Sequence, residues 1–304
     1  MPDLYAAVDC GTNSVRLLVC RREHGRLVEL DRRLHLTRLG QGVDATGRFH
    51  PDALARTLDA MADFGAELDR LEVPPAHRRV VATSAARDAA NSAEFFTGAR
   101  ARLGVDAEVI PGEEEARLSY AGAVAGLPGI VQPVLVMDIG GGSTELVLGG
   151  DSVPSHAVSL DVGAVRVRER FLHSDPPLPK EVAAARSYVG GLLDGSGIDF
   201  PRVATWVGVG GTATSLSALV QSLPSYDRAL VHGSVVAQVE LAALTDRLLA
   251  LPVAEVAALP TMVPGRADVI CAGALICELV ARRVGASLTV SEADILDGIV
   301  IHLA

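Results

Sequence analysis

The stretches DCGTNSVRLL at residues 9–18 and DIGGGSTELVL at residues 138–148 decide the fold of this chain. Each follows a short apolar run, LYAAV at 4–8 and PVLVM at 133–137. The pattern predicts a strand that ends at an Asp, a turn rich in Gly and hydroxyl residues, and a second strand that runs back. Because Gly has no Cβ, the backbone N–H groups of such a turn can converge on an anion. The sequence therefore predicts two phosphate-binding turns in two similar halves.

The composition is that of a folded protein with room for two domains. The chain has 304 residues, of which 49% are hydrophobic and 21% charged. Aromatic residues make up only 4% and the net charge is −10, which argues against a nucleic-acid binder. We find no signal peptide, and the longest apolar segment, 267–281, carries two acidic residues, so no membrane association is expected. Four cysteines without a CxxC pair indicate a reduced, cytoplasmic setting.

The hydrophobic pattern predicts an α/β protein with two domains, residues 1–128 and 129–304. In the first half we expect strands at 4–9, 14–21, 26–36, 78–85 and 107–110, and helices at 51–71, 91–103 and 113–127. In the second half we expect strands at 133–138, 144–149, 153–160, 204–209 and 287–291, and helices at 163–171, 179–193, 210–220, 235–250, 253–258 and 266–283. A last helix at about 292–304 could pack back on the first domain.

The opening strand–turn–strand pattern occurs twice, and we interpret it as an internal repeat. The alternative is a chance similarity of two glycine turns. The agreement of the flanking strands in both copies favours the repeat. The segment LPGIVQP at 127–133, with two Pro and one Gly, is the clearest boundary between the halves.

A third glycine turn, GVGGTA at 208–213, fits G-x-G-x-x-A between a strand and a helix. A dinucleotide fingerprint also expects an acidic residue at the end of a second strand about twenty positions on. Here Asp227 lies in a loop-like context, which argues against that fingerprint. The turn can instead bind a phosphate at a helix N-terminus, or it can be a structural helix entry.

Carboxylates are the remaining chemically capable groups. Glu113, Glu114 and Glu115 follow a Pro-Gly turn at the start of a helix. Acidic residues there stabilise the helix dipole, which explains one or two of the three. A glutamate behind a phosphate site could also take a proton from water. The Asp before each of the first two turns, Asp9 and Asp138, is well placed to hold a divalent cation.

These segments resemble a known family, the exopolyphosphatases and guanosine pentaphosphate phosphohydrolases (Ppx/GppA) of the actin-like, sugar-kinase and heat-shock ATPase superfamily. The likeness spans essentially the whole chain. It implies two actin-like domains with the active site in the cleft between them. The motifs that carry it are DCGTNSVRLL (9–18), ATSAARDAAN (82–91), IPGEEEARL (110–118), DIGGGSTEL (138–146), GGTATSLSAL (210–219) and RADVICAG (266–273).

The resemblance also implies roles for individual residues. Glu115 looks like the catalytic base, with Glu114 as the fallback, because three consecutive glutamates allow a slip of one. Asp138 and Glu145 resemble the acidic pair that holds Mg²⁺ or Mn²⁺, with Asp9 as a further contributor. Arg87 has a structural ion pair as its alternative role. The residues expected to bind phosphate are Gly11, Thr12, Asn13, Ser14, Arg16, Arg87, Gly140, Gly141, Gly142, Ser143, Thr144, Gly210, Gly211, Thr212 and Arg266.

Three functions compete at this stage. The first is an exopolyphosphatase acting on short inorganic polyphosphate. The second is a phosphohydrolase that converts guanosine pentaphosphate to guanosine tetraphosphate. The third is a non-enzymatic alarmone or nucleotide sensor. The three carboxylates argue against the sensor. A sugar kinase would need a sugar-binding Asp and an adenosine pocket, which we do not find. Long family members add C-terminal domains, and this chain resembles the short form, hence the expected short substrate. Dimers are common among such relatives, so a homodimer is an expectation of the resemblance.

Overall fold

The protein is described by a computed structural model covering residues 3–150, 153–263 and 265–304. It divides into two compact units. Unit 1 is the chain up to Gly122 together with Ile295–Ala304, and unit 2 is Ala123–Asp294. The chain passes between the units twice, once inside helix α5 (Gly112–Gly126) and once just before helix α13 (Ile295–Leu303). The boundary expected at 128/129 lies a few residues beyond the first passage.

Unit 1 contains a five-stranded sheet and its covering helices. Pro51 occupies the first helical position of α2, where its missing N–H costs nothing. The elements of unit 1, besides α5 and α13, are β1 (Leu4–Cys10), β2 (Ser14–Glu23), β3 (Arg26–Leu36), α1 (Val43–Thr46), α2 (Pro51–Arg70), the 3₁₀ turn η1 (Pro75–His77), β4 (Arg78–Ala82), α3 (Ser84–Asp88), α4 (Ser92–Leu103) and β5 (Ala107–Val109).

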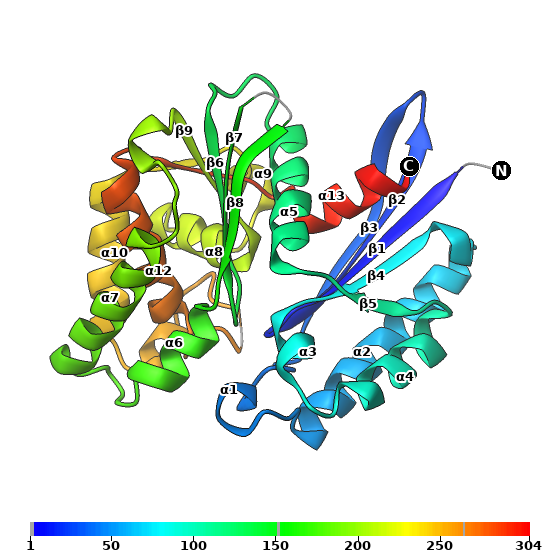
Figure 1. The fold of residues 1–304 in the computed structure, drawn as a ribbon, viewed down its shortest axis with the longest axis horizontal. Coiled ribbons are helices and arrows are strands. Elements are labelled where there is room, and N and C mark those ends of the chain that lie inside the picture. Colours follow the sequence, from blue (N-terminus) through cyan, green and yellow to red (C-terminus); the bar gives the residue numbers. More distant parts are fainter. Residues whose placement is uncertain (1–2, 151–152, 264) are drawn as a thin grey trace. The chain divides into compact units, whose positions relative to one another are not determined.

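The sheet of unit 1 has the order β3-β2-β1-β4-β5. Strands β1, β2 and β3 form the expected antiparallel meander, and β4 and β5 continue it in parallel. Alternate residues of β1 face opposite sides, so both faces are buried. Ala6, Val8 and Cys10 belong to the apolar cluster that also holds the inner faces of α2 and α4. Tyr5 and Ala7 belong to a second cluster with α13, which lies across β1 and β2 (Figure 1).

Unit 2 contains a six-stranded sheet. Helix α12 covers the expected apolar segment and is buried along almost its whole length, packed against α6, α7, α8 and α10. The elements are β6 (Val134–Ile139), β7 (Thr144–Gly150), β8 (Val153–Leu160), α6 (Ala164–Phe171), α7 (Pro179–Asp194), the 3₁₀ turn η2 (Phe200–Arg202), β9 (Thr205–Val209), α8 (Gly210–Val220), α9 (Arg228–Val231), β10 (Val235–Val236), α10 (Gln238–Ala250), α11 (Val253–Ala257), α12 (Ile270–Val284) and β11 (Leu288–Val290).

The two sheets share one topology, which confirms the internal repeat. Read from β8, the order in unit 2 is β8-β7-β6-β9-β11, with β10 added at the edge, and it matches β3-β2-β1-β4-β5. The first three strands are antiparallel and the next two parallel in both units. Register irregularities also occur at equivalent places, between Val19 and Cys20 and between Leu148 and Gly149. The α/β class and the duplicated strand order are therefore confirmed.

Several elements differ from the expectation. The strand expected at 78–85 ends at Ala82, because Ser84–Asp88 turns into the short helix α3. The short elements α1, α9 and β10 were not expected. The helix expected from 266 begins at Ile270, and the one expected from 235 begins at Gln238. These are all places where local sequence carries little period, so tertiary packing decides the conformation.

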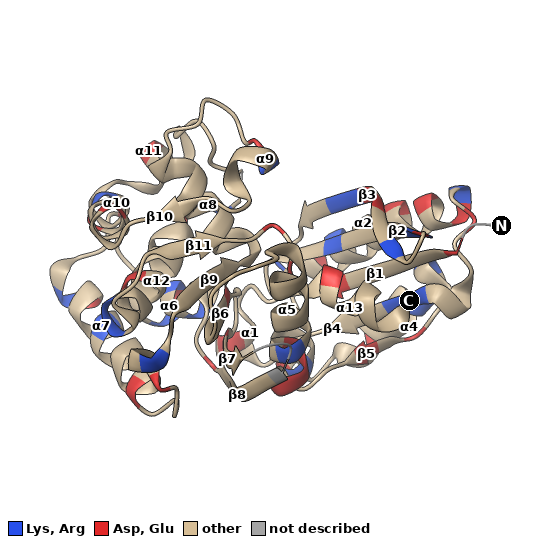
Figure 2. Cartoon of the chain, turned by 90° about the horizontal axis from the view of Figure 1, so that it is seen from above, with Lys and Arg blue, Asp and Glu red and all other residues tan. Residues whose placement is uncertain are grey.

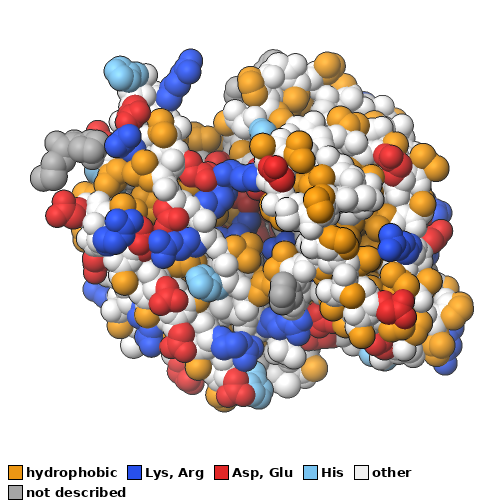
Figure 3. Space-filling view, turned by 180° about the vertical axis from the view of Figure 1, so that it is seen from behind, with side chains coloured by type: hydrophobic (Ala, Val, Ile, Leu, Met, Phe, Trp, Pro, Cys, Tyr) orange, Lys and Arg blue, Asp and Glu red, His pale blue; other side chains and the backbone are white. Residues whose placement is uncertain are grey.

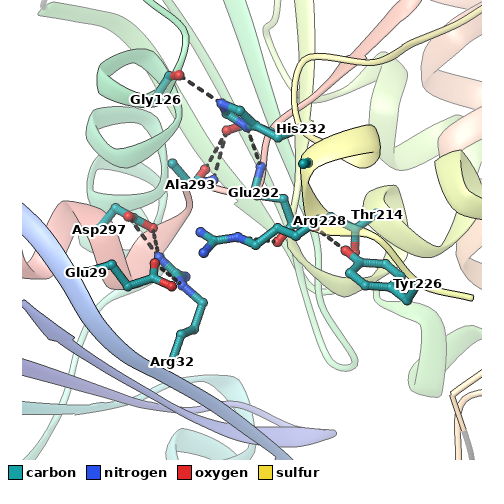
Figure 4. A network of polar contacts seen from close by, with 12 residues as sticks. Glu29, Arg32, Gly126, Thr214, Tyr226, Arg228, His232, Glu292, Ala293 and Asp297 are labelled. Atoms are coloured by element: carbon teal, nitrogen blue, oxygen red, sulfur yellow. Dashed lines mark hydrogen bonds and ion pairs between the residues drawn. The ribbon is translucent and has the colours of Figure 1, made fainter.

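Polar contacts fix the segments at which the chain passes between the units, namely α13 in unit 1 and the end of α5 and the residues after β11 in unit 2 (Figure 4). In unit 1, Arg32 of β3 donates to both carboxylate oxygens of Asp297, each at 2.9 Å, and so ties α13 to the sheet. In unit 2, one ring nitrogen of His232 lies 3.1 Å from the carbonyl oxygen of Gly126 at the end of α5. The other ring nitrogen accepts from the Glu292 N–H, just after β11, at 3.1 Å. His232 therefore joins the two chain segments that leave unit 2.

Charged residues are frequent in some strands and absent from others. Strand β3 carries five charged residues, whereas β9 in the middle of its sheet carries none (Figure 2). On the face shown in Figure 3, basic and acidic side chains are interspersed. This distribution offers no basic stripe on that face for a nucleic-acid backbone. Among the described residues, no helix combines the length and apolar character that crossing a bilayer requires.

Candidate active site

The expected site residues of unit 1 lie at one edge of its sheet. Cys10, Ala82 and Val109 end the parallel strands β1, β4 and β5 and are paired in register. The segments that follow these strands therefore emerge side by side. They are the first glycine turn, the start of α3, and the Pro-Gly turn that opens α5. Ligands of open α/β sheets bind at this carboxyl edge.

The first turn has the form of an anion cradle. The Gly11 N–H donates to the Ser14 carbonyl at 2.9 Å, which closes the turn. The Asn13 carbonyl accepts from Thr37 and Arg38, and the Thr12 carbonyl accepts from Gly40. These contacts hold the turn through its carbonyl groups. The N–H groups of Thr12 and Asn13 donate to no acceptor within the part of the chain that the structure describes. Such N–H groups are suited to phosphate oxygens.

The structure distinguishes the three glutamates of α5. Glu113 is 69% exposed and lies 3.7 Å from Arg117. Glu114 lies 2.5 Å from Arg79 of β4 in an ion pair. Glu115 is the buried one, with a side chain only 12% exposed and 3.6 Å from Arg87. Because Glu114 is held by Arg79 against the strand, Glu115 is the better placed of the two for chemistry at the sheet edge.

Arg87 lies in the last turn of α3 and contacts two groups beside the turn that opens α5. Its Nη1 donates to the Ile110 carbonyl at 2.7 Å and makes the ion pair with Glu115. The ion pair proposed as the alternative role of Arg87 is therefore present. An arginine that pairs with a carboxylate at 3.6 Å can also contact a substrate anion, and that role stays a prediction.

Asp9 and Arg16 are cross-strand neighbours in β1 and β2. Arg16 donates from Nε and Nη2 to one oxygen of Asp9, at 3.1 and 2.6 Å, and Asp9 is 5% exposed. This pair makes Asp9 a weaker candidate for a metal ligand and engages Arg16 within the protein. Burial, together with the neighbouring Asp9, raises the pKa of the Cys10 thiol. Cys10 is therefore a packing residue and not a reactive thiol.

The second turn, in unit 2, repeats this arrangement at the end of β6. The Gly140 N–H donates to the Ser143 carbonyl at 3.0 Å, as Gly11 does to Ser14. The start of α6 donates to the turn, from Ala164 to the Gly140 carbonyl and from Val165 to the Gly141 carbonyl, both at 2.9 Å. Over residues 3–150, 153–263 and 265–304, the N–H groups of Gly141, Gly142 and Ser143 donate to no acceptor. The hydroxyl of Thr144 donates to the Val162 carbonyl at 2.5 Å, so its proton is engaged within the protein.

The third turn joins β9 to α8. Gly210 has φ +74°, which L side chains rarely adopt, and a Cβ there would lie 2.6 Å from Asp138 Oδ1. A Cβ at Gly211 would lie 2.3 Å from Arg266 Nη2. Arg266 donates from Nη1 to the Gly211 carbonyl at 2.9 Å and to Ser215 Oγ at 3.1 Å. Thr212 donates its hydroxyl to the Ile139 carbonyl at 2.9 Å. The turn thus packs against β6 and carries the Arg266 guanidinium beside it.

Asp138 and Glu145 are the residues that could hold a divalent cation. They are paired in register on the antiparallel strands β6 and β7, so their side chains lie on the same face of the sheet. Within the described residues no three His, Cys, Asp or Glu side chains form a metal-binding group. Mg²⁺ commonly uses one or two carboxylates plus substrate phosphates, so two carboxylates beside a turn suited to phosphate oxygens fit this ion. The metal role stays a prediction.

Two residues of unit 2 were not expected from the sequence. Arg166 of α6 donates from Nε to the Gly142 carbonyl at 2.8 Å and so helps to hold the second turn. Ser159 of β8 donates to Glu145 Oε1 at 2.7 Å. Both follow from strand register and helix packing. The only sequence signal was the predicted third strand of the repeat.

Two α/β units, each with a glycine turn whose N–H groups can hold an anion, are typical of proteins that handle phosphoryl groups. The model of the Ppx/GppA phosphatase family matches residues 18–302. Exopolyphosphatase 2 of Mycobacterium tuberculosis is 48% identical over an alignment 316 positions long, which covers 98% of each chain. The chain belongs to the Ppx/GppA phosphatase family.

Solved structures agree with this assignment. The Aquifex aeolicus member of the Ppx/GppA family is 31% identical, with a TM-score of 0.83 over 98% of this chain and 96% of that chain. An exopolyphosphatase from Cytophaga hutchinsonii is 25% identical, with a TM-score of 0.91 over 99% and 97% of the two chains. The family resemblance inferred from the motifs and the expected enzyme class, a hydrolase of phosphoanhydride bonds, are confirmed.

Proposed function

We propose that this protein is an exopolyphosphatase, which releases terminal orthophosphate from inorganic polyphosphate. The observation that carries the proposal is the 48% identity, over 98% of both chains, to a protein named Exopolyphosphatase 2. The two anion-binding turns and the buried Glu115 support it, because a polyphosphate offers only phosphate oxygens and phosphoanhydride bonds to a site. Short chains are the expected substrate. The four cysteines of the chain are free and buried, which supports a reducing, cytoplasmic setting.

We propose Glu115 as the general base. Water attacks the terminal phosphorus, the bond to the leaving phosphate oxygen breaks, and the water proton passes to the Glu115 carboxylate. A positioned base of this kind contributes about 10²–10⁴ in rate. Arg87, beside Glu115, would bind oxygens of the phosphoryl group. In each unit the N–H groups of the glycine turn would hold phosphate oxygens, and electrostatic stabilisation of this kind is a large part of phosphoryl-transfer catalysis.

We propose Asp138 and Glu145 as the carboxylates that hold Mg²⁺ or Mn²⁺. The ion, when bound, would offset charge that develops on the phosphate oxygens. Asp9 is a less favoured ligand, because Arg16 already neutralises it. Arg266 would contact substrate anions from the turn that begins α8.

A set of three glutamine variants tests the assignment of the base. Glu115→Gln removes the proposed base and keeps the side-chain shape, so phosphate release from tripolyphosphate should fall at least about 100-fold. Glu113→Gln is the matched control, since that exposed residue lies on the same helical turn, and its activity should stay near that of the unaltered protein. Glu114→Gln tests the alternative assignment, in which Glu114 is the base. Full activity in Glu115→Gln, or a loss confined to Glu114→Gln, would contradict the proposal.

A second candidate substrate is guanosine pentaphosphate, because the family that matches this chain is named for both activities. Both substrates present a terminal phosphoanhydride. Mg²⁺-dependent phosphate release should therefore be measured side by side on tripolyphosphate, long polyphosphate and guanosine pentaphosphate. The highest kcat/KM on tripolyphosphate supports the short-chain exopolyphosphatase. The highest kcat/KM on guanosine pentaphosphate supports the guanosine pentaphosphate phosphohydrolase instead. No phosphate release from any of the three substrates indicates an alarmone sensor.

A further inference from the structure

Three polar residues form one row across the sheet of unit 2. Asp138 of β6 is paired in register with Glu145 of β7, and Glu145 is paired with Ser159 of β8. Directly paired residues of antiparallel strands project from the same face of the sheet. The row therefore places a carboxylate, a second carboxylate and a hydroxyl in sequence, beginning at the strand that leads into the second glycine turn.

The equivalent row of unit 1 has a different composition. Asp9 is paired with Arg16, and Arg16 with Leu34. There the guanidinium neutralises the first carboxylate directly, and the third position is apolar. In unit 2 the position of Arg16 is taken by Glu145 and that of Leu34 by Ser159. Like charges directly opposite each other are destabilising, so the row of unit 2 is suited to a cation shared by its two carboxylates.

Ser159 fixes the middle member of the row. Its hydroxyl donates to Glu145 Oε1 at 2.7 Å, and Glu145 is only 2% exposed. A hydrogen bond to a carboxylate at this distance is short and charge-assisted. It holds the carboxylate in one orientation, as a cation shared with Asp138 would require. Groups that orient a metal ligand in this way set its affinity for the ion.

We propose that Ser159 is a positioning residue that orients Glu145 for a divalent cation. The inference rests on the proposed cation role of Asp138 and Glu145. In this role Ser159 acts through Glu145 and would contact neither the substrate nor the cation. Removing its hydroxyl would leave the chemistry intact and weaken the hold on the ion, typically by about 10–100-fold.

Calorimetric titration of the full chain with Mn²⁺ tests the proposal without an activity measurement. Ser159→Ala should bind Mn²⁺ about 10–100-fold more weakly than the unaltered protein. The side chains of Thr and Val have the same shape and differ only in the hydroxyl. Ser159→Thr should therefore bind Mn²⁺ like the unaltered protein, and Ser159→Val should bind it as weakly as Ser159→Ala. Ser155→Ala is the matched control, because Ser155 lies on the same strand and donates to the Leu148 carbonyl instead. It should bind Mn²⁺ normally.

Phosphate release from tripolyphosphate gives the second measurement. In Ser159→Ala the Mg²⁺ concentration for half-maximal rate should rise, while kcat at saturating Mg²⁺ stays near normal. A fall in kcat with unchanged Mg²⁺ dependence would indicate a merely structural role and overturn the inference.

Glu145→Gln separates this inference from the proposed metal site. If Glu145→Gln loses Mn²⁺ affinity while Ser159→Ala and Ser159→Val keep it, the site stands and the role of Ser159 is wrong. If Glu145→Gln also binds Mn²⁺ normally, or the unaltered chain does not bind it, the proposed metal site is wrong and the inference fails with it.

Discussion

Gly298 of α13 lies directly against the backbone of α5, and Gly298→Ala should therefore disturb both stability and catalysis. A Cβ at this position would lie 2.0 Å from the Leu118 carbonyl oxygen and 2.7 Å from its carbonyl carbon. Real Cβ contacts essentially never fall below 3.0 Å. The nearest atom belongs to a helix backbone and cannot rotate away, so α13 and α5 must separate by about 1 Å.

The size of the effect follows from two opposing terms. Overpacking costs about 1–3 kcal/mol, and a backbone contact belongs at the upper end of that range. Replacing Gly by Ala inside a helix returns about 1 kcal/mol. The net loss in the free energy of unfolding of unit 1 is therefore about 2 kcal/mol, which lowers its Tm by several degrees. Glu115, the proposed base, lies one turn before Leu118 on α5, and a 1 Å displacement of a catalytic group can cost about 100-fold in rate.

Differential scanning calorimetry and phosphate release on the same preparations measure the two effects. Gly191→Ala is the matched control, because Gly191 lies inside α7 and a Cβ there meets no atom within 4 Å. That variant should gain up to about 1 kcal/mol and keep full activity. A Gly298→Ala protein with unchanged Tm and unchanged kcat would refute the reasoning, as would an equal response of the two variants.

Two further predictions concern a charge cluster and a turn. The pKa of Glu67 lies at about 2, below its ordinary 4.5, mainly because Arg70 and then Arg33 hydrogen-bond to its carboxylate. A carboxylate with a lowered pKa stabilises the fold above pH 4.5, and this stabilisation is lost as the pH falls towards 2. In urea unfolding, Glu67→Gln should therefore be less stable than the unaltered protein at pH 7 and equally stable near pH 2. A difference in the free energy of unfolding that does not change with pH would count against this. Gly211→Ala should displace the flexible Arg266 side chain and change the Tm little. The KM for tripolyphosphate should rise about tenfold, because one charge-assisted contact to the substrate is lost. An unchanged KM would show that Arg266 does not contact the substrate.

Much of the fold could be predicted from the sequence because local pattern and tertiary structure agree there. The short apolar runs of β1 and β6 and the glycine turns that follow them specify strand, turn and strand in both units, and the duplicated topology follows. The segment after β4 was predicted wrongly as strand to residue 85, since its small residues lack a period that separates strand from helix. The short edge strand β10 depends on pairing with β11, which a local pattern does not contain.

The sequence predicted one part of the candidate site, and the other part became clear only from the structure. The motifs located the turns and the three glutamates, but the choice between Glu114 and Glu115 depends on which one meets Arg79. That contact comes from β4 and has no local signal. The pairing of Arg16 with Asp9 is a matter of register across a hairpin, and Ser159 is reached only through a second hairpin. Contacts made across strands therefore required the three-dimensional structure.

The return of α13 to unit 1 has a consequence for the order of events on the ribosome. Ile295, Leu296, Ile299 and Val300 complete the apolar cluster that also contains Tyr5, Ala7 and Leu18. These four residues are synthesised after the whole of unit 2, whereas Tyr5, Ala7 and Leu18 are synthesised before it. Domains usually fold in the order in which they are translated. Here the unit that begins the chain must wait, with one face of its sheet uncovered, until the whole of unit 2 has left the exit tunnel.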